Sequence, residues 1–338
     1  MGQDERTTLI ALTVAAITMT IVTLCLVRSR NRRELILNNR IHVIQAGGDF
    51  EHGFLQAYEK QKNLFGNFDS SVLEPPINSS ELNPAEWNGL VANIDSKYRE
   101  YDAFVVVVGR DTLAYTASAL AFMLENLGKP VILVDGEVAP AIKVASSTRI
   151  PEVMVYSAGN LIRGCKCVPW NTSGFSSPNY PALTMRTALR PPRGGYIARA
   201  VNPKTKVLVI RMFPGIDAKY VNNAMARDMP NAIVFQLYGV GHGPTNDDFL
   251  GVISMLAKKG VVMVSVSQVE QMNQPYEAND RFIAAGILDG RDMTTEAAFA
   301  KLHYLLANVA DQKMIGALMS QNLRGEMVIP ESIEGDYL

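Results

Sequence analysis

The chain has 338 residues, which is enough for two domains, because a single hydrophobic core stops growing at about 250–300 residues. Its 32 Lys and Arg residues balance 33 Asp and Glu residues to a formal net charge of -1. This balance excludes a protein whose overall field attracts nucleic acid, so no nucleic-acid partner is expected. Three cysteines, Cys25, Cys165 and Cys167, cannot supply the disulfide framework of a small secreted protein, and they favour a reducing compartment.

An apolar stretch without charges occupies residues 7–27, after a short N-terminal tail at residues 1–6. Its length matches the roughly 20 residues that a transmembrane helix needs. A cleaved signal peptide is the alternative, but the tail contains Asp4 and Glu5 where a signal peptide is basic. The connector at residues 28–40 is rich in arginine, so the positive-inside rule places the body on the cytosolic or matrix side of a single-pass membrane protein.

The first half of the body alternates β-branched runs with helical patterns. We expect strands at 41–46, 103–108, 130–134 and 153–157, and helices at 86–98 and 112–127. Glycine turns follow the first two of these strands, at Gly47-Gly48 and at Gly109. This alternation predicts a parallel, doubly wound α/β sheet, which binds ligands at the carboxyl ends of its strands.

Residues 163–203 are rich in Pro, Gly, Ser and Asn, which indicates a domain boundary. The second half repeats the α/β pattern, with strands expected at 207–212, 232–238 and 261–266, and helices at 218–228, 247–259 and 294–306. We therefore predict a larger N-terminal domain, a linker and a smaller C-terminal α/β domain, at 41–190, 191–204 and 205–338.

No metal or cofactor site is expected. Cys165 and Cys167 are separated by one residue, which is not the Cys-x-x-Cys spacing, so they are interpreted as ordinary loop thiols. His303 lies in a helical pattern and is interpreted as a packed core histidine. The other histidines are too scattered for a ligand set; they are His42, His52 and His242.

Several longer motifs are specific. They are Tyr101–Val106, Thr112–Leu120, Phe122–Val131 and Ser320–Glu326. Together they resemble the type I, cytosolic-type L-asparaginases, and the resemblance runs from about Ile41 to Glu326. It implies a larger N-terminal and a smaller C-terminal α/β domain, dimers or tetramers, and amide hydrolysis by an activated threonine.

The resemblance also implies where catalytic residues should stand, and most of them are replaced. The threonine after the first glycine turn falls on Asp49, and the threonine of the family's Thr-Asp pair falls on Arg110. Asp111, the second member of that pair, keeps its place. The relay lysine falls on Pro169, which has no group that could transfer a proton.

These substitutions leave three interpretations of the pocket. Asp49 and Arg110 could form a salt bridge that fills it, Arg110 could bind a small anion, or the chemistry could be altered. Ser79, Ser80 and Asp111 survive as vestigial ligand-binding positions. The family's turn after the third strand is also changed, to Asp135-Gly136-Glu137, and the helix after it is shortened by roughly three turns.

The sequence therefore favours a catalytically inactive asparaginase-like protein that serves as a membrane-anchored accessory subunit of a larger membrane complex. Its expected partners are lipid, through residues 7–27, and other protein subunits, with a homodimer as the state that the resemblance implies. A mitochondrial inner membrane is favoured over the endoplasmic reticulum. The alternatives are residual hydrolysis of asparagine to aspartate and ammonia, or a sensor that binds an amino acid without turning it over.

Overall fold

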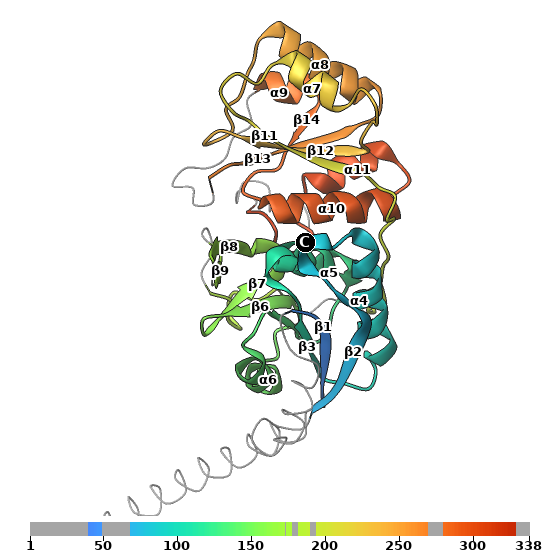
Figure 1. The fold of residues 1–338 in the computed structure, drawn as a ribbon, viewed down its shortest axis with the longest axis vertical. Coiled ribbons are helices and arrows are strands. Elements are labelled where there is room, and N and C mark those ends of the chain that lie inside the picture. Colours follow the sequence, from blue (N-terminus) through green and yellow to red (C-terminus); the bar gives the residue numbers. More distant parts are fainter. Residues whose placement is uncertain are drawn as a thin grey trace, which may run out of the picture.

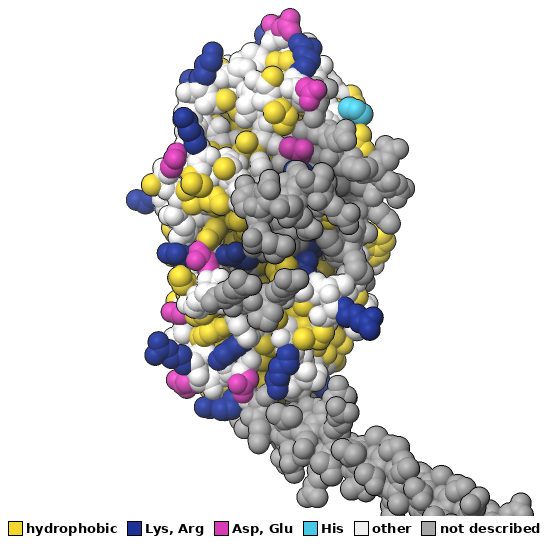
Figure 2. All heavy atoms as spheres, turned by 180° about the vertical axis from the view of Figure 1, so that it is seen from behind, with side chains coloured by type: hydrophobic (Ala, Val, Ile, Leu, Met, Phe, Trp, Pro, Cys, Tyr) yellow, Lys and Arg dark blue, Asp and Glu magenta, His cyan; other side chains and the backbone are white. Residues whose placement is uncertain are grey.

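The fold is known from a computed structural model. It describes residues 40–48, 68–172, 174–177, 182–189, 194–269 and 280–328. Within these ranges no helix has the length and apolar character to cross a membrane, and the stretch at 7–27 lies outside them. Charged side chains of both signs are dispersed over both domains, as Figure 2 shows for one face.

A six-stranded sheet forms the N-terminal domain, in the order β2-β1-β3-β5-β6-β7, and every pair is parallel except β6 with β7. Its strands are β1 (Ile41–Gly47), β2 (Phe68–Ile77), β3 (Ala103–Val107), β5 (Val131–Val134), β6 (Val153–Ser157) and β7 (Asn160–Arg163). Helices α4 (Pro84–Lys97) and α5 (Leu113–Met123) pack on one face, and α6 (Val138–Ser147) packs on the other. The N-terminal domain is thus wound on both sides, as the sequence predicted.

Shorter elements connect these layers. The 3-10 helices are η1 (Ser79–Glu81), η2 (Arg110–Thr112) and η3 (Gly164–Lys166). The short strands form two antiparallel pairs, β4 (Leu124–Glu125) with β10 (Ile197–Ala198) and β8 (Val168–Asn171) with β9 (Gly174–Ser176).

The C-terminal domain is a four-stranded parallel sheet in the order β11-β12-β13-β14. Its strands are β11 (Val207–Arg211), β12 (Ala232–Leu237), β13 (Val262–Ser267) and β14 (Ile287–Asp289). Helices α7 (Ala218–Ala224), α8 (Asp247–Lys258) and α9 (Asp280–Ala285) cover its outer face. Helices α10 (Thr295–Asn308) and α11 (Gln312–Met319) lie on the face toward the N-terminal domain (Figure 1).

The two domains meet where α5 packs against α10. Every residue of α5 except Tyr115 is buried, which is typical of a helix enclosed between two layers. One hydrophobic core therefore continues from the N-terminal sheet, through α5 and α10, to the inner face of the C-terminal sheet. Stacked rings of Phe122 and Tyr304, with centroids 6.1 Å apart, lie in this layer.

Two expected helices end earlier than predicted, and one edge strand was missed. The helix expected at 218–228 ends at Ala224. The helix predicted at 112–127 ends at Met123, because the chain turns into β4 and pairs with β10, and Asn126 adopts a positive φ of 52°. The sequence also missed β2, an edge strand whose residues are mostly half-buried or exposed and which contains Pro75 and Pro76. Without an apolar alternation, such a strand resembles a loop.

A buried ion pair joins the domains beside the α5–α10 layer. The Lys166 Nζ atom on η3 lies 3.0 Å from Asp292 Oδ2, and the two side chains are 2% and 15% exposed. The other carboxylate oxygen of Asp292 accepts the backbone N–H of Val328 at 2.8 Å. The Cys165-Lys166-Cys167 segment is therefore no exposed loop, because all three residues are buried, and burial raises the pKa of the Cys165 thiol to about 12.

Replacing Lys166 by Met should lower the free energy of unfolding by about 3 kcal/mol, because it removes the cation that is paired with the largely buried Asp292 carboxylate. Adding Asp292→Asn should recover part of this loss, since the asparagine oxygen can still accept the Val328 N–H. Urea denaturation of the wild type, both single variants and the double variant measures the coupling. Additive effects would show that the pair contributes nothing across the interface.

His303 on α10 is a buried core histidine, as predicted. It is 2% exposed, and its ring lies edge-on to Trp87, with centroids 5.8 Å apart. The Nδ1 atom of His303 is buried without a hydrogen-bond partner. Burial lowers the pKa of this imidazole from the ordinary 6.5 to about 4, so the ring is neutral in the folded protein at neutral pH.

This depressed pKa predicts that stability is lost as pH falls. Between pH 6.5 and 4 the unfolded chain binds a proton at His303 that the folded chain does not, so the free energy of unfolding decreases over that window. The difference in free energy of unfolding between His303→Phe and the wild type should therefore shift in favour of the variant when the pH is lowered from 7.5 to 5, because only the wild type has this histidine. Urea midpoints at both values test this, and an unchanged difference between the proteins would contradict it.

Candidate functional site

A cavity of about 540 Å³ lies at the carboxyl ends of the N-terminal strands, the edge at which the parallel sheet predicts ligand binding. Its lining comes from the last residues of β1 and β2 and from residues that follow β1, β2, β3 and β5. These residues are Gly47, Gly48, Pro76, Ile77, Asn78, Ser79, Gly109, Arg110, Asp111 and Asp135. Four strand ends thus converge on one polar cavity.

Arg110 is bound to two neighbouring segments. Its Nε donates to Asp135 Oδ2, directly after β5, and its terminal NH1 group donates to the carbonyl oxygen of Thr172 in the β8–β9 hairpin. The Arg110 side chain is 45% exposed, so this ion pair is partly solvated and contributes little to stability. Its geometric effect is to link the end of β3, the end of β5 and the hairpin.

Asp111 and Ser79 form the second contact in the cavity. The Ser79 hydroxyl donates to Asp111 Oδ2 at 3.2 Å, and the Thr112 hydroxyl donates to the carbonyl oxygen of Ser79 at 2.9 Å. These bonds hold η1 against η2. The close approach of Ser79 to the backbone before η2 requires glycine at position 109, because a Cβ atom there would lie 2.5 Å from the Ser79 side chain.

The predicted site residues are only partly brought together. Ser79, Arg110 and Asp111 line the cavity, whereas the Ser80 hydroxyl donates to Asn78 Oδ1 at 2.9 Å and is not part of the lining. Pro169 is exposed on β8, where it pairs with Phe175 and is also not part of the lining. Asp49 lies outside the described residues, so its pairing with Arg110 stays a prediction.

Sequence reasoning missed the partners that Arg110 has in the structure. Asp135 was recognised only as a departure from the family's turn, and the carbonyl oxygen of Thr172 gave no signal at all. Because β3 and β5 are parallel neighbours, the residues that follow them lie side by side, and this register could have predicted the Arg110–Asp135 pair. The Arg110–Asp135 pair lines the cavity, and filling of the pocket by an Asp49–Arg110 pair stays a prediction.

The cavity presents little that could perform nucleophilic chemistry. Arginine stays protonated in proteins and cannot act as a base or a nucleophile. The Ser79 hydroxyl belongs to a class of side chains that serve as nucleophiles, and the Asp111 carboxylate lies next to it. Asp111 would have to act as the base, but it is exposed to solvent. Among the described residues no group of three or more His, Cys, Asp or Glu side chains is placed to hold a metal ion.

Comparisons with known proteins agree with this fold. Residues 41–190 match the model for "Asparaginase, N-terminal", and residues 206–319 match that for the "Glutaminase/Asparaginase C-terminal domain". L-asparaginase 1 of Escherichia coli is 37% identical over 281 residues, covering 75% of this chain and 82% of its own. The 60 kDa lysophospholipase of Mus musculus is 32% identical over 293 residues, covering 77% of this chain and 51% of its own.

A solved structure gives the same result for the architecture. The crystal structure of L-asparaginase I from Vibrio cholerae superposes with a TM-score of 0.80 at 31% sequence identity, covering 86% of this chain and 99% of that one. Both domains and their arrangement are thus matched by relatives of known fold. The chain belongs to the asparaginase family.

Proposed function

We propose that this chain is a member of the asparaginase family that does not hydrolyse amides and that acts as a membrane-anchored accessory subunit of a larger membrane complex. One observation supports the proposal that the chain does not hydrolyse amides. Arg110, at the position where the resemblance places a threonine, is bound to Asp135 and to the Thr172 carbonyl, and a guanidinium cannot act as a base or a nucleophile.

The proposal of a membrane anchor rests on the residues that precede the N-terminal domain. Residues 7–27 are long and apolar enough for one membrane pass, and the arginines that follow place the body on the cytosolic or matrix side. An enzyme that acts on a soluble amino acid gains little from such an anchor, whereas a subunit of a membrane complex needs one. A mitochondrial inner membrane is the location we favour over the endoplasmic reticulum.

The main alternative is a residual amidohydrolase, and the Ser79–Asp111 hydrogen bond is the observation that favours it. A serine activated by a carboxylate could in principle attack an amide, and the open cavity could admit asparagine. The same cavity also leaves room for a sensor that binds an amino acid without turning it over. Both alternatives depend on Asp111, which makes this residue the control for catalysis.

Ammonia release from L-asparagine and L-glutamine tests the proposal on catalysis. The purified full chain in detergent should release no ammonia above the background of its Asp111→Ala variant, because no activated nucleophile is present. L-asparaginase 1 of Escherichia coli provides the positive control. Release by the wild type that disappears in both Ser79→Ala and Asp111→Ala would establish the residual amidohydrolase instead.

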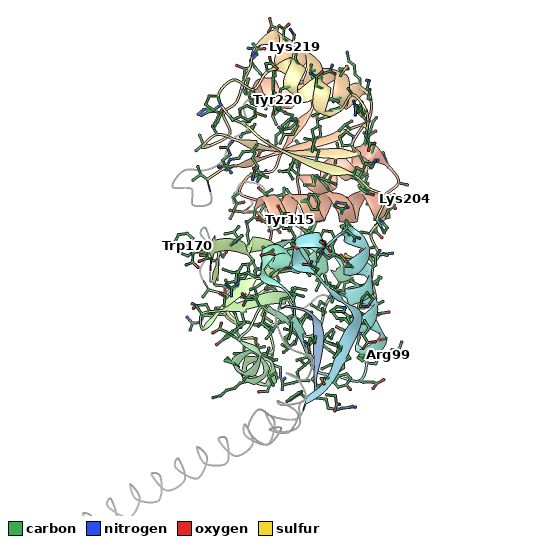
Figure 3. All side chains as sticks on the ribbon, in the orientation of Figure 1. Arg99, Tyr115, Trp170, Lys204, Lys219 and Tyr220 are labelled. Atoms are coloured by element: carbon green, nitrogen blue, oxygen red, sulfur yellow. The ribbon has the colours of Figure 1, made fainter. Side chains whose placement is uncertain are left out.

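A second prediction concerns the structural role of Arg110. Trp170 is 58% exposed on β8 and is labelled at the side of the molecule in Figure 3. It is one of only two tryptophans, and the other, Trp87, is buried. Trp170 can therefore report the motion of the hairpin that Arg110 holds through Thr172.

In a Trp87→Phe background, Arg110→Ala should lower the fluorescence anisotropy of Trp170, because the hairpin loses its bond to Arg110 and keeps that of Phe175 to Ser157 on β6. The free energy of unfolding should fall by at most about 1 kcal/mol, since the Arg110–Asp135 pair is partly solvated. Lys204→Ala, an exposed cation far from the hairpin, is the matched control. Equal anisotropy in the Arg110→Ala variant and its background would show that Arg110 does not restrain the hairpin.

A further inference from the structure

A second cavity, of about 170 Å³, lies where α5 ends and β6 begins. Because β3, β5 and β6 are parallel, the beginning of β6 is at the end of the sheet opposite the cavity described above. The two cavities share no lining residue. The second cavity is therefore separate from the site at which the fold predicts ligand binding.

Much of the wall of the second cavity is apolar. Its apolar side chains include Ala121, Leu124, Leu127, Pro151, Val153 and Leu323. A cavity of about 150 Å³ with a lining of this kind is large enough to bind benzene. The space therefore suits a compact apolar group of about six carbon atoms.

A carboxylate and a guanidinium in the same wall neutralise each other. Arg163 Nε donates to Glu152 Oε2 at 2.6 Å, and Arg163 Nη2 donates to Glu152 Oε1 at 3.2 Å. The Glu152 Oε1 atom also accepts the backbone N–H of Leu189 at 2.7 Å. Both oxygens of Glu152 are thus engaged, and its side chain is only 5% exposed.

Arg324 is the cation of this region that has no carboxylate of its own. The other two carboxylates nearby are paired elsewhere, Glu125 with Arg199 at 3.0 Å and Glu326 with Lys301 at 2.6 Å. Arg324 is attracted by Glu125 but forms no ion pair with it or with any other described residue. The cavity wall therefore carries one positive charge in excess.

The structural role of Arg324 leaves part of its guanidinium available. Its Nε donates to the carbonyl oxygen of Ala121 in the last turn of α5 at 3.2 Å, and its Nη1 donates to the carbonyl oxygen of Leu323 at 2.9 Å. A helix terminus offsets only about half of a unit charge. The Nη2 group has no hydrogen-bond partner in the described part of the chain.

The turn that carries Arg324 is held in place. Asn322 Oδ1 accepts the backbone N–H of Gly325 at 2.6 Å, and Asn322 Nδ2 donates to the carbonyl oxygen of Met327 at 2.8 Å. Gly325 adopts a φ of 80°, and a Cβ atom there would lie 2.7 Å from Arg163 Nη1. The turn thus packs directly on Arg163, so the cavity is formed before a ligand arrives and binding costs little ordering.

We propose that this cavity binds a small monocarboxylate with a compact apolar body. The carboxylate accepts hydrogen bonds from the Arg324 guanidinium, whose planar fork matches it, and the body lies against the apolar wall. An inorganic anion would leave that wall in contact with water, and a neutral molecule would leave the charge of Arg324 without a partner. The proposal goes beyond the proposed function and requires neither the anchor nor the loss of hydrolysis.

Binding of 4-fluorobenzoate to the purified full chain in detergent, followed by its ¹⁹F line width, tests the proposal. Its neutral counterpart, 4-fluorobenzamide, should bind at least about tenfold more weakly, because it lacks the charge-assisted hydrogen bonds. Inorganic phosphate at the same ionic strength should not displace 4-fluorobenzoate. Equal affinity for the two fluorinated compounds, or displacement by phosphate, would overturn the proposal.

Two variants separate the wall from the charge. Ala121→Leu fills the cavity and should abolish binding, and in the same detergent it measures partition into micelles. Ala92→Leu, at an exposed position of α4, adds the same side chain elsewhere and should bind as the wild type does. Arg324→Gln should weaken binding at least about tenfold, with Arg324→Lys between the two, because lysine keeps the charge without the fork.

Urea midpoints show whether each variant is folded, and Ala121→Leu tests the site even if Arg324→Gln is unstable. Binding to Ala121→Leu with the wild-type affinity would contradict the proposal, as would the absence of wild-type binding. Arg110→Ala should leave the affinity unchanged. Loss of binding in that variant would place the carboxylate in the cavity at the carboxyl ends of the strands instead.

Discussion

The packing of α5 against α10 is the interaction on which the rest of the structure depends. Because α5 is buried on nearly all sides, it has no stable place unless both the N-terminal sheet and α10 enclose it. The shared core fixes the two domains against each other, and with them the strand ends that face the C-terminal domain. The position of the cavity is therefore a product of the packing.

Because the cavity is positioned by the packing of the strands and helices, the fold does not depend on which side chain occupies position 110. The cavity forms because parallel strands end at one edge, and the contact of Ser79 with Asp111 is kept by Gly109, which admits the close approach. None of these features depends on a hydroxyl at position 110. An arginine there finds a carboxylate at the end of the next strand and a carbonyl in the hairpin, and the fold accommodates it without disturbing the core.

The sequence predicted those parts of the fold that follow from local apolar patterns. The buried strands β3 and β5 and the amphipathic helix α8 coincide with their predicted ranges to within about two residues, because their patterns are strong. It failed at β2, whose edge position leaves it without such a pattern, and at the end of α5, where pairing of β4 with β10 overrides helix propensity. For the site, it placed Ser79 and Asp111 in one cavity through the resemblance, but it did not find the Arg110–Asp135 pair, which depends on contacts between segments far apart along the chain.

Two of the ion pairs in the structure, Arg110–Asp135 and Lys166–Asp292, differ in how much a substitution would cost. Arg110 is 45% exposed, so water solvates its charge even if Asp135 is removed, and substitution at this position has a small cost in stability. Lys166 is 2% exposed, so its charge depends on Asp292 and other neighbouring groups to offset the loss of water, and removing Asp292 raises the cost of keeping that charge buried. The fold therefore tolerates a substitution at position 110 more easily than one at Lys166.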